Sequence, residues 1–231
     1  MSSKESTVAK RSLQALGVAS AIGAGVLAYS LAEAKSYRLR GVQVPVLEPG
    51  SEPLQVLHLS DLHMTPRQAG KAEWIQHLAD LQPDLVVATG DFMAHPDAVY
   101  PVTAALGPLL DIPGFFVFGS NDYYAPKIGN PFTYLVGPTN YDRGEPDLPW
   151  PELSSALSSG GWIDLSNRRD HIKVDGRLID VRGVDDPHIG RDQYEPIAGP
   201  FDPTADLALG VSHAPYLRVL DAMADDGAQL I

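Results

Sequence analysis

The chain has 231 residues, of which 44% are hydrophobic and 20% are charged, and these proportions are typical of an ordinary globular protein. Its 29 acidic residues outnumber 17 basic ones, which argues against a nucleic-acid-binding surface because such a surface needs clustered Lys and Arg. The sequence has no cysteine, which excludes disulfides, zinc–thiolate sites and cysteine nucleophiles.

An uncharged apolar stretch runs from Leu13 to Leu31, near the N-terminus. It has about the length that a helix needs to cross a bilayer, so we predict a transmembrane or signal-anchor helix over 13–32. A cleaved signal peptide is the alternative, because Ala32-Glu33-Ala34 has the small-x-small form of a cleavage site. We expect a single-pass protein of the cell membrane whose main domain lies outside the cytoplasm, with secretion after cleavage as the alternative.

Short apolar strands and helical segments alternate after the apolar stretch. The expected segments are a flank at 1–12, the helix at 13–32, a linker at 33–53 and a domain at 54–231. The expected strands are 54–59, 84–89, 115–118, 162–165, 171–174, 177–184 and 207–212, and the expected helices are 72–81, 98–110, 152–157 and 214–226. The βαβαβ order at the start implies a parallel or mixed sheet covered by helices. Asp175-Gly176 between two alternating segments predicts a hairpin, and therefore a second sheet.

Polar side chains follow four of these strands at the point where each strand ends. They are Asp61 and His63, Asp91, the run Gly119-Ser120-Asn121-Asp122, and His213. Asp61 and His63 are two positions apart, so in an extended segment both side chains point the same way and can reach one metal ion. A carboxylate such as Asp91 is the usual bridge between two cations, and an imidazole such as His213 suits Zn, Mn or Fe. Each motif alone is more typical of a solvated loop or a turn, but the ordered series predicts a metal-dependent phosphoesterase site.

This series resembles the motif order of calcineurin-like metallophosphoesterases, which is D-x-H, G-D, G-N-H-[DE], a strand-terminal His and G-H-x-H. The segments LHLSDLH, PDLVVATGD and VFGSND also resemble the membrane-associated bacterial branch of that family. The resemblance covers residues 54–231 and implies an α/β fold, a four-layer α/β/β/α sandwich of two mixed sheets. It implies two divalent metal ions (Mn, Fe or Zn), with Asp61 and His63 holding the first, Asp91 bridging and His213 holding the second.

The same resemblance implies hydrolysis of a phosphomonoester, a phosphodiester or a phosphoanhydride by a metal-bridged hydroxide. The expected substrate is a phosphorylated small molecule or a lipid-linked one, including a nucleotide-sugar pyrophosphate, and no nucleic acid is expected as a partner. The N-terminal helix is expected to attach the protein to a membrane. The alternative is a catalytically impaired or non-catalytic relative that binds a ligand or partner through the same fold.

The chain departs from the family pattern at two motifs. In the third motif, Ser120 takes the place of the ligand Asn, and Asn121 takes that of the His that assists the leaving group. A local shift would instead place Asn121 at the metal, which we favour, and we predict catalytic roles for Asn121 and Asp122. The leaving-group proton then comes from water or another residue, which favours good leaving groups such as phosphoanhydrides. The G-H-x-H motif is absent, so we expect a C-terminally truncated domain that binds metal weakly and turns over slowly.

Candidate substrate contacts lie outside these motifs. Tyr123, Tyr124 and Lys127 closely follow the third motif, with loop packing as the alternative. A second D-x-H triplet, Asp186-Pro187-His188, lies in a loop after the hairpin, and there His188 is the candidate contact. Together with Asp185, this triplet either lines the mouth of the site or forms an ordinary polar loop.

Overall fold

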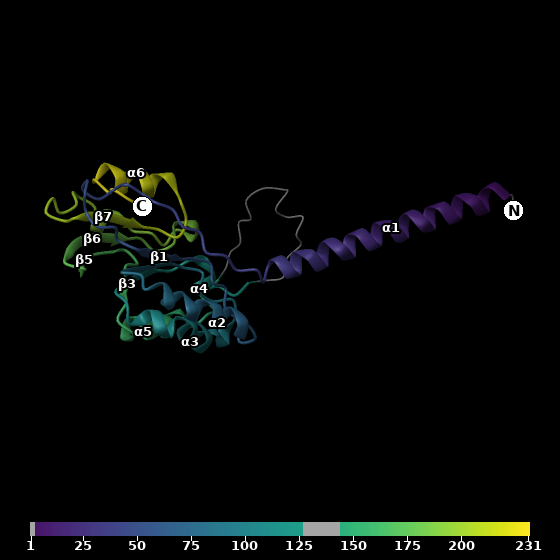
Figure 1. Cartoon of the computed structure of the whole chain (residues 1–231), viewed down its shortest axis with the longest axis horizontal. Coiled ribbons are helices and arrows are strands. Elements are labelled where there is room, and N and C mark those ends of the chain that lie inside the picture. Colours follow the sequence, from purple (N-terminus) through teal and green to yellow (C-terminus); the bar gives the residue numbers. More distant parts are fainter. Residues whose placement is uncertain (1–2, 127–143) are drawn as a thin grey trace. The chain divides into compact units, whose positions relative to one another are not determined.

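A computed structural model describes residues 3–126 and 144–231, which leaves the Lys127 prediction outside the described residues. The chain divides into two units, Met1–Gln43 and Val44–Ile231. The first unit contains α1 (Ser3–Glu33), a single long helix (Figure 1). Within it, the window Leu16–Glu33 has a mean hydropathy of 1.4 and none of it is buried, so it is long and apolar enough to cross a membrane. A membrane anchor and a signal sequence both have these properties.

The second unit begins its first sheet with the predicted alternation of strands and helices. Its strands are β1 (Val56–Leu59), β2 (Leu85–Thr89), β3 (Gly114–Val117) and β4 (Ile163–Asp164), paired in that order. The helical segments between them are α2 (Ala69–Gln76), η1 (His77–Leu81), η2 (Pro96–Ala98), α3 (Val99–Leu110), α4 (Ser120–Tyr123) and α5 (Trp150–Ser159). All three strand pairs are parallel, so this sheet is parallel in its described strands, where the resemblance implied a mixed one.

The second sheet is mixed. It contains β5 (Arg168–Val174), β6 (Arg177–Gly183) and β7 (Leu207–Val211). β5 and β6 pair antiparallel through the predicted turn, where Asp175 and Gly176 have φ of 49° and 78° as a type I′ turn requires. β6 and β7 pair parallel, so the ends of these two strands lie at the same edge. The remaining helical segments are η4 (Pro187–Ile189), η5 (Glu195–Ile197) and α6 (Leu217–Asp225).

The alternation of side chains along β2 shows how the layers pack. Val86 and Ala88 belong to the apolar cluster that the first sheet shares with its helices, whereas Leu85 and Val87 belong to the cluster between the two sheets. On the other side, Val219 and Met223 of α6 form a third cluster. Figure 1 shows α2, α3 and α5 along one side of the paired sheets and α6 along the other. The α/β class and the two-sheet sandwich are therefore confirmed.

The ends of several elements differ from the sequence expectation for local reasons. The helix expected at 72–81 begins earlier and tightens into the 3₁₀ segment η1 before Gln82, which has a left-handed φ of 52°. The helix expected at 214–226 begins at Leu217. Leu230 forms a parallel bridge with Leu209, at the position where the sequence predicted a new strand. The short helix α4 was not expected, and it carries the third motif.

Candidate metal centre

The predicted motifs lie together where strands of the two sheets end, at adjoining edges of the sheets. The first sheet is parallel, so the loops after β1, β2 and β3 leave it at one edge. On the second sheet, the register pairs Gly183 with Val211, which brings the loops after β6 and β7 together. The two edges are joined by the Nδ1 atom of His213, which lies 2.5 Å from the carbonyl oxygen of Thr89. An Nδ1–H donated to that oxygen leaves the Nε2 lone pair free to bind a cation.

The backbone that carries three of the predicted ligand residues is left-handed. Asp61, His63 and Asp91 have φ of 55°, 40° and 54°, a region that non-glycine residues seldom occupy. The side chains of Asp61 and His63 therefore do not converge through an extended backbone, as the sequence argument assumed. Two hydrogen bonds between the loops fix this geometry, from Asp61 N to Gly90 O (3.1 Å) and from His63 N to Asp91 O (2.8 Å). Such strain, held by surrounding contacts, is common at functional sites.

Asp91 lies at the middle of the cluster and has an imidazole on each side. Its Oδ2 is 3.6 Å from His63 Nε2, and its Oδ1 is 3.6 Å from His213 Nε2. His63 Nε2 is also 3.6 Å from Asp61 Oδ1. These separations are too long for hydrogen bonds, but two ligand atoms on one tetrahedral cation lie about 3.4 Å apart. One ligand atom each of Asp61, Asp91 and His213 also falls within 4.8 Å of the others, so the donor set fits divalent cations.

Two glycines allow this close approach. A Cβ at Gly119 would lie 2.3 Å from Asp91 Oδ1 and 2.7 Å from His213 Nε2. A Cβ at Gly90, whose φ is 72°, would lie 2.4 Å from the backbone nitrogen of Gly119. Real Cβ contacts are never this short, so the glycines in the second and third motifs are required by packing and not only by flexibility.

Comparison with known proteins gives a family match that covers the residues of this site. A family model described as calcineurin-like phosphoesterase matches residues 54–215. The chain belongs to the calcineurin-like phosphoesterase family. It therefore belongs to a family of metal-dependent phosphoester hydrolases, and Asp61, His63, Asp91 and His213 lie within the matched residues.

Two relatives of this calcineurin-like phosphoesterase come from Bacillus subtilis (strain 168). The uncharacterized metallophosphoesterase YkoQ is 26% identical over 143 residues, which are 60% of this chain and 45% of YkoQ. The uncharacterized protein YpbG is 24% identical over 225 residues, which are 96% of this chain and 76% of YpbG. The chain thus spans about half the length of the first relative and three quarters of the second.

Two solved structures are more distantly similar. A purple acid phosphatase from yellow lupin seeds (Lupinus luteus) has a TM-score of 0.37 at 19% identity, covering 65% of this chain and 28% of that one. The phosphopantetheinyl hydrolase PptH of Mycobacterium tuberculosis has a TM-score of 0.33 at 12% identity, covering 74% of this chain and 61% of that one.

Asp122 stabilises the loop that carries Asp91. Its carboxylate is completely buried and accepts hydrogen bonds from the backbone N–H groups of Asp91 (2.8 Å), Phe92 (2.7 Å), Met93 (3.2 Å) and Gly119 (3.0 Å). Burial raises the pKa of Asp122 to about 7, and the nearby charge of Asp91 adds to the rise. A group so enclosed cannot touch a substrate, so the predicted catalytic role of Asp122 does not fit its position. It acts on Asp91 through the loop.

Asn121 lies beside Asp91, as the shifted reading of the third motif requires. Its backbone N–H donates to Asp91 Oδ1 (2.8 Å), and its side-chain amide donates to Asp91 Oδ2 (2.7 Å). Ser120 is buried within α4. A half-turn of the Asn121 amide exchanges its oxygen and nitrogen, and this would present the oxygen that a cation needs. The role of Asn121 as a metal ligand stays a prediction.

The charges of Asp91 and His213 depend on each other. Burial alone would raise the pKa of Asp91, but the nearby imidazole of His213 and the hydrogen bonds from Asn121 outweigh it and lower that pKa. Burial likewise opposes the protonation of His213, yet Asp91, the Thr89 carbonyl and Asp186 raise its pKa to about 9. In the absence of cations the two residues form an ion pair. A cation that binds His213 must displace its proton.

The predicted substrate contacts occupy three different environments. Tyr123 is 1% exposed, donates its hydroxyl to Asp185 (2.8 Å) and packs its ring 4.0 Å from the Arg191 guanidinium, so it is a packing residue and not a substrate contact. Tyr124 is half-buried. His188 is exposed on η4, beside the fully buried Asp186.

No local sequence signal pointed to Arg191 or to the role of Asp185. Asp185 Oδ2 accepts a hydrogen bond from Arg191 Nε (2.9 Å), in addition to the Tyr123 hydroxyl. The partners are distant in sequence, since 62 positions separate Tyr123 from Asp185. This network ties the helix of the third motif to the loop that follows β6.

Proposed function

We propose that the chain hydrolyses phosphate esters or anhydrides with two divalent metal ions, Mn, Fe or Zn. The observation that carries the proposal is the position of Asp91 between two imidazoles. Each of its carboxylate oxygens faces a different Nε2 atom at 3.6 Å, that of His63 on one side and that of His213 on the other. This is the arrangement of a carboxylate that bridges two cations.

The proposed ligand roles follow from these distances. Asp61 and His63 hold the first cation, Asp91 bridges, and His213 holds the second together with Asn121. When bound, the cations polarise the phosphoryl oxygens and lower the pKa of a water molecule, so that no protein nucleophile is needed. Thr89 holds His213 in the tautomer that presents Nε2, and Asp122 holds the Asp91 loop.

The proposed substrate is a phosphorylated small molecule or a lipid-linked one, such as a nucleotide-sugar pyrophosphate. Support for a lipid-linked substrate comes from α1, whose exposed apolar window suits attachment to a membrane. We propose that α1 anchors the protein in the cell membrane with the phosphoesterase domain outside the cytoplasm. Secretion after cleavage of a signal sequence is the competing location.

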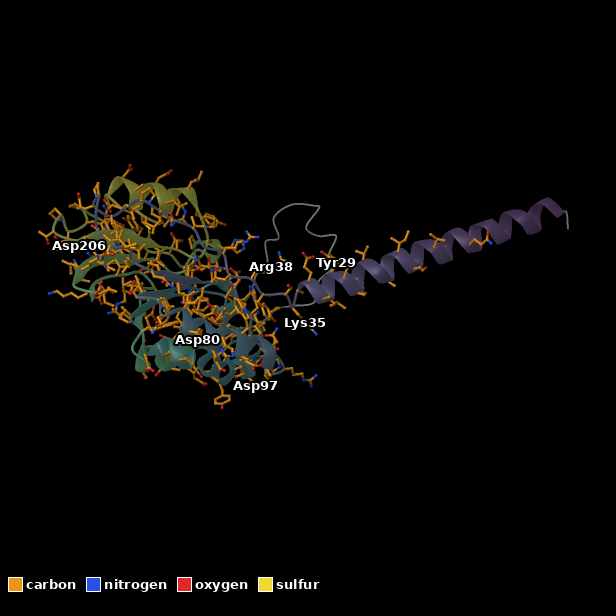
Figure 2. The ribbon with its side chains drawn as sticks, in the orientation of Figure 1. Tyr29, Lys35, Arg38, Asp80, Asp97 and Asp206 are labelled. Carbon is orange, nitrogen blue, oxygen red and sulfur yellow. The ribbon has the colours of Figure 1, made fainter. Side chains whose placement is uncertain are left out.

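Hydrolysis of p-nitrophenyl phosphate with Mn²⁺ tests the proposal. Asp91→Asn should lower the rate by more than about 100-fold, because even residues that only support a metal ligand contribute about 10- to 100-fold. Asp80→Asn is the matched control, since this carboxylate is 79% exposed and lies on the surface (Figure 2). Equal rates for wild type and Asp91→Asn would contradict the proposal.

One observation favours a second candidate, a non-catalytic relative that binds a ligand through the same fold. The third motif offers the amide of Asn121 where the family pattern has an imidazole, and that amide donates to Asp91. Binding of Mn²⁺ and of inorganic phosphate without hydrolysis of any ester would establish this candidate instead.

A further inference from the structure

The third motif leaves the reaction without a proton donor at its usual place. Asn121 uses both its backbone and its side-chain nitrogen to bond Asp91, and an amide does not release a proton at neutral pH. An ester with a poor leaving group needs a proton on the departing oxygen. A second group at the same edge must therefore supply that proton if such esters are hydrolysed.

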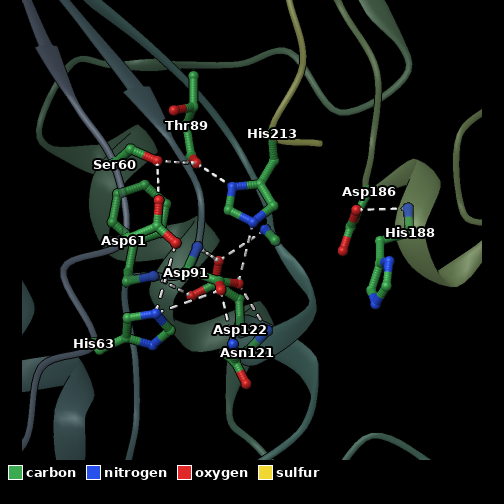
Figure 3. Close-up of polar contacts among 12 residues, drawn as sticks. Ser60, Asp61, His63, Thr89, Asp91, Asn121, Asp122, Asp186, His188 and His213 are labelled. Carbon is green, nitrogen blue, oxygen red and sulfur yellow. Dashed lines mark hydrogen bonds and ion pairs between the residues drawn. The ribbon is translucent and has the colours of Figure 1, made fainter. Parts of the chain in front are cut away.

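The loop after β6 brings a histidine to that edge. β6 and β7 end in register, and the N–H of Val184 donates to Val211 O (3.1 Å), so this loop leaves the sheet beside the loop of His213. Figure 3 shows Asp186 and His188 next to that loop. Burial raises the pKa of the Asp186 carboxyl, and the backbone N–H of His188 together with the imidazoles of His213 and His188 partly offsets the rise.

His188 is held in place at two points. Its backbone N–H donates to Oδ1 of the fully buried Asp186 (2.8 Å), which caps η4. Its Nδ1 lies 3.2 Å from the hydroxyl of Tyr216, three residues beyond His213. The ring itself is exposed, and within residues 3–126 and 144–231 its Nε2 has no hydrogen-bond partner. The imidazole is thus oriented through one nitrogen and available through the other.

A buried oxygen beside this histidine supports a binding role for the loop. Asp186 Oδ2 is buried and has no partner in the described part of the chain, although its Oδ1 is bonded. Buried carboxylate oxygens are nearly always paired in folded proteins. The groups that face His188 are then Asp186 from its own loop and Tyr216 from the loop after β7.

We infer that His188 protonates the leaving group of the phosphoester, with Asp186 and Tyr216 as the residues that position it. The inference rests on the proposed function. The oxygen of a water molecule forms a bond to phosphorus, and the ester P–O bond breaks with its electron pair on the departing oxygen. That oxygen takes the proton of His188 Nε2 and leaves as an alcohol. The water molecule releases its own proton, and the imidazole regains one from solvent.

Two esters with different leaving groups test the assignment in the full chain with Mn²⁺. The p-nitrophenolate ion leaves p-nitrophenyl phosphate without a proton, whereas the alkoxide that leaves an alkyl phosphate such as glycerol phosphate needs one. His188→Ala should lower the rate on the alkyl ester by about 100-fold or more and leave the aryl ester within a few-fold of wild type. His188→Gln keeps a polar side chain of similar size. It should behave in the same way, because an amide does not release a proton at neutral pH. Tyr216→Phe should lower only the alkyl rate, and by less.

His95→Ala is the matched comparison, because His95 is also exposed and follows the second motif on the opposite sheet. It should leave both rates near wild type. Equal losses on both esters in His188→Ala, a loss on neither, or a selective loss in His95→Ala would each overturn the assignment. So would a wild-type chain that hydrolyses only the aryl ester. A wild type that hydrolyses neither ester would refute the proposed function itself.

Discussion

The two sheets build their halves of the candidate metal centre by different means. On the first sheet the ligand positions depend on the backbone: Asp61, His63 and Asp91 have left-handed φ angles, and Asp122 accepts hydrogen bonds from three N–H groups of the Asp91 loop and from that of Gly119. On the second sheet His213 is placed by its own ring, which bonds across to Thr89. The first half is therefore formed before any cation binds, while the second half depends on side-chain contacts between the sheets.

This difference predicts where the centre is rigid. A ligand set fixed through several backbone hydrogen bonds binds a cation with little reorganisation. A ligand fixed through one side-chain hydrogen bond moves when that bond or its partner changes. Changes at the point where the halves touch should therefore affect function most, and changes within the first half should affect stability most.

The contact between the halves at Gly119 should give the largest effect. In Gly119→Ala the new methyl group would meet Asp91 Oδ1 at 2.3 Å and His213 Nε2 at 2.7 Å, which forces the two ligands apart. Mn²⁺-dependent hydrolysis should fall by more than about 100-fold, because a misplacement of about 1 Å at the reacting groups costs that much. Steady-state rates on p-nitrophenyl phosphate measure the loss.

Gly107→Ala is the control for this substitution. Apart from its chain neighbours and the surrounding helix backbone, no atom lies within 4 Å of a Cβ at Gly107, which is inside α3, so the alanine methyl group fits there. Its activity should equal that of wild type. If Gly119→Ala retained full activity, the two halves would not meet as closely as these distances show.

Within the first half, Asp122→Ala should cost the most stability. The substitution leaves four buried backbone N–H groups without their acceptor. The free energy of unfolding should fall by roughly 3–5 kcal/mol, measured by urea denaturation. Asp80→Ala, at an exposed position, should change it by less than about 0.5 kcal/mol. A loss in Asp122→Ala no larger than that of the control would mean that the loop is held in some other way.

The parts of this architecture that follow from local pattern could be predicted from sequence. The strands, the Asp175-Gly176 turn and the order of the motifs depend on neighbours a few residues apart. Because the strands of the first sheet are parallel, their ends had to share one edge, and this alone brought Asp61 and Asp91 together.

The parts that depend on distant partners could not be predicted. Asp122 reads as a site residue by its place in the third motif, but three of its four partners are backbone groups about 30 positions away, which carry no sequence signature. From sequence, Tyr123 looks like an exposed loop residue, but in the fold Asp185 and Arg191, which are distant in sequence, contact it. The left-handed backbone at His63 could not be predicted from sequence either, because histidine adopts it only where surrounding contacts impose it.

Because the second half depends on a pair of charged side chains, it should make the free energy of unfolding depend on pH. In the metal-free chain the pKa of His213 is raised to about 9 from an ordinary value of 6.5, with Asp91 as its partner. The ion pair therefore stabilises the folded state fully below pH 6.5, and this contribution, on the order of 3 kcal/mol, is lost as the pH rises through about 9. At acid pH the ion pair is lost when Asp91 becomes protonated. Because the pKa of Asp91 is lowered, this happens only as the pH falls through that depressed value.

Urea denaturation of the metal-free chain between pH 6 and 9.5 measures this loss. His213→Gln should flatten the profile over that range, because glutamine cannot carry the charge. His77→Gln should keep the wild-type profile, since the imidazole of His77 is 70% exposed on η1 and pairs only with Asp80 within the described residues. Since a bound cation displaces the proton from His213, saturating Zn²⁺ should flatten the wild-type profile as well. A slope that persists in His213→Gln would place the titrating group elsewhere and leave the second half as rigid as the first.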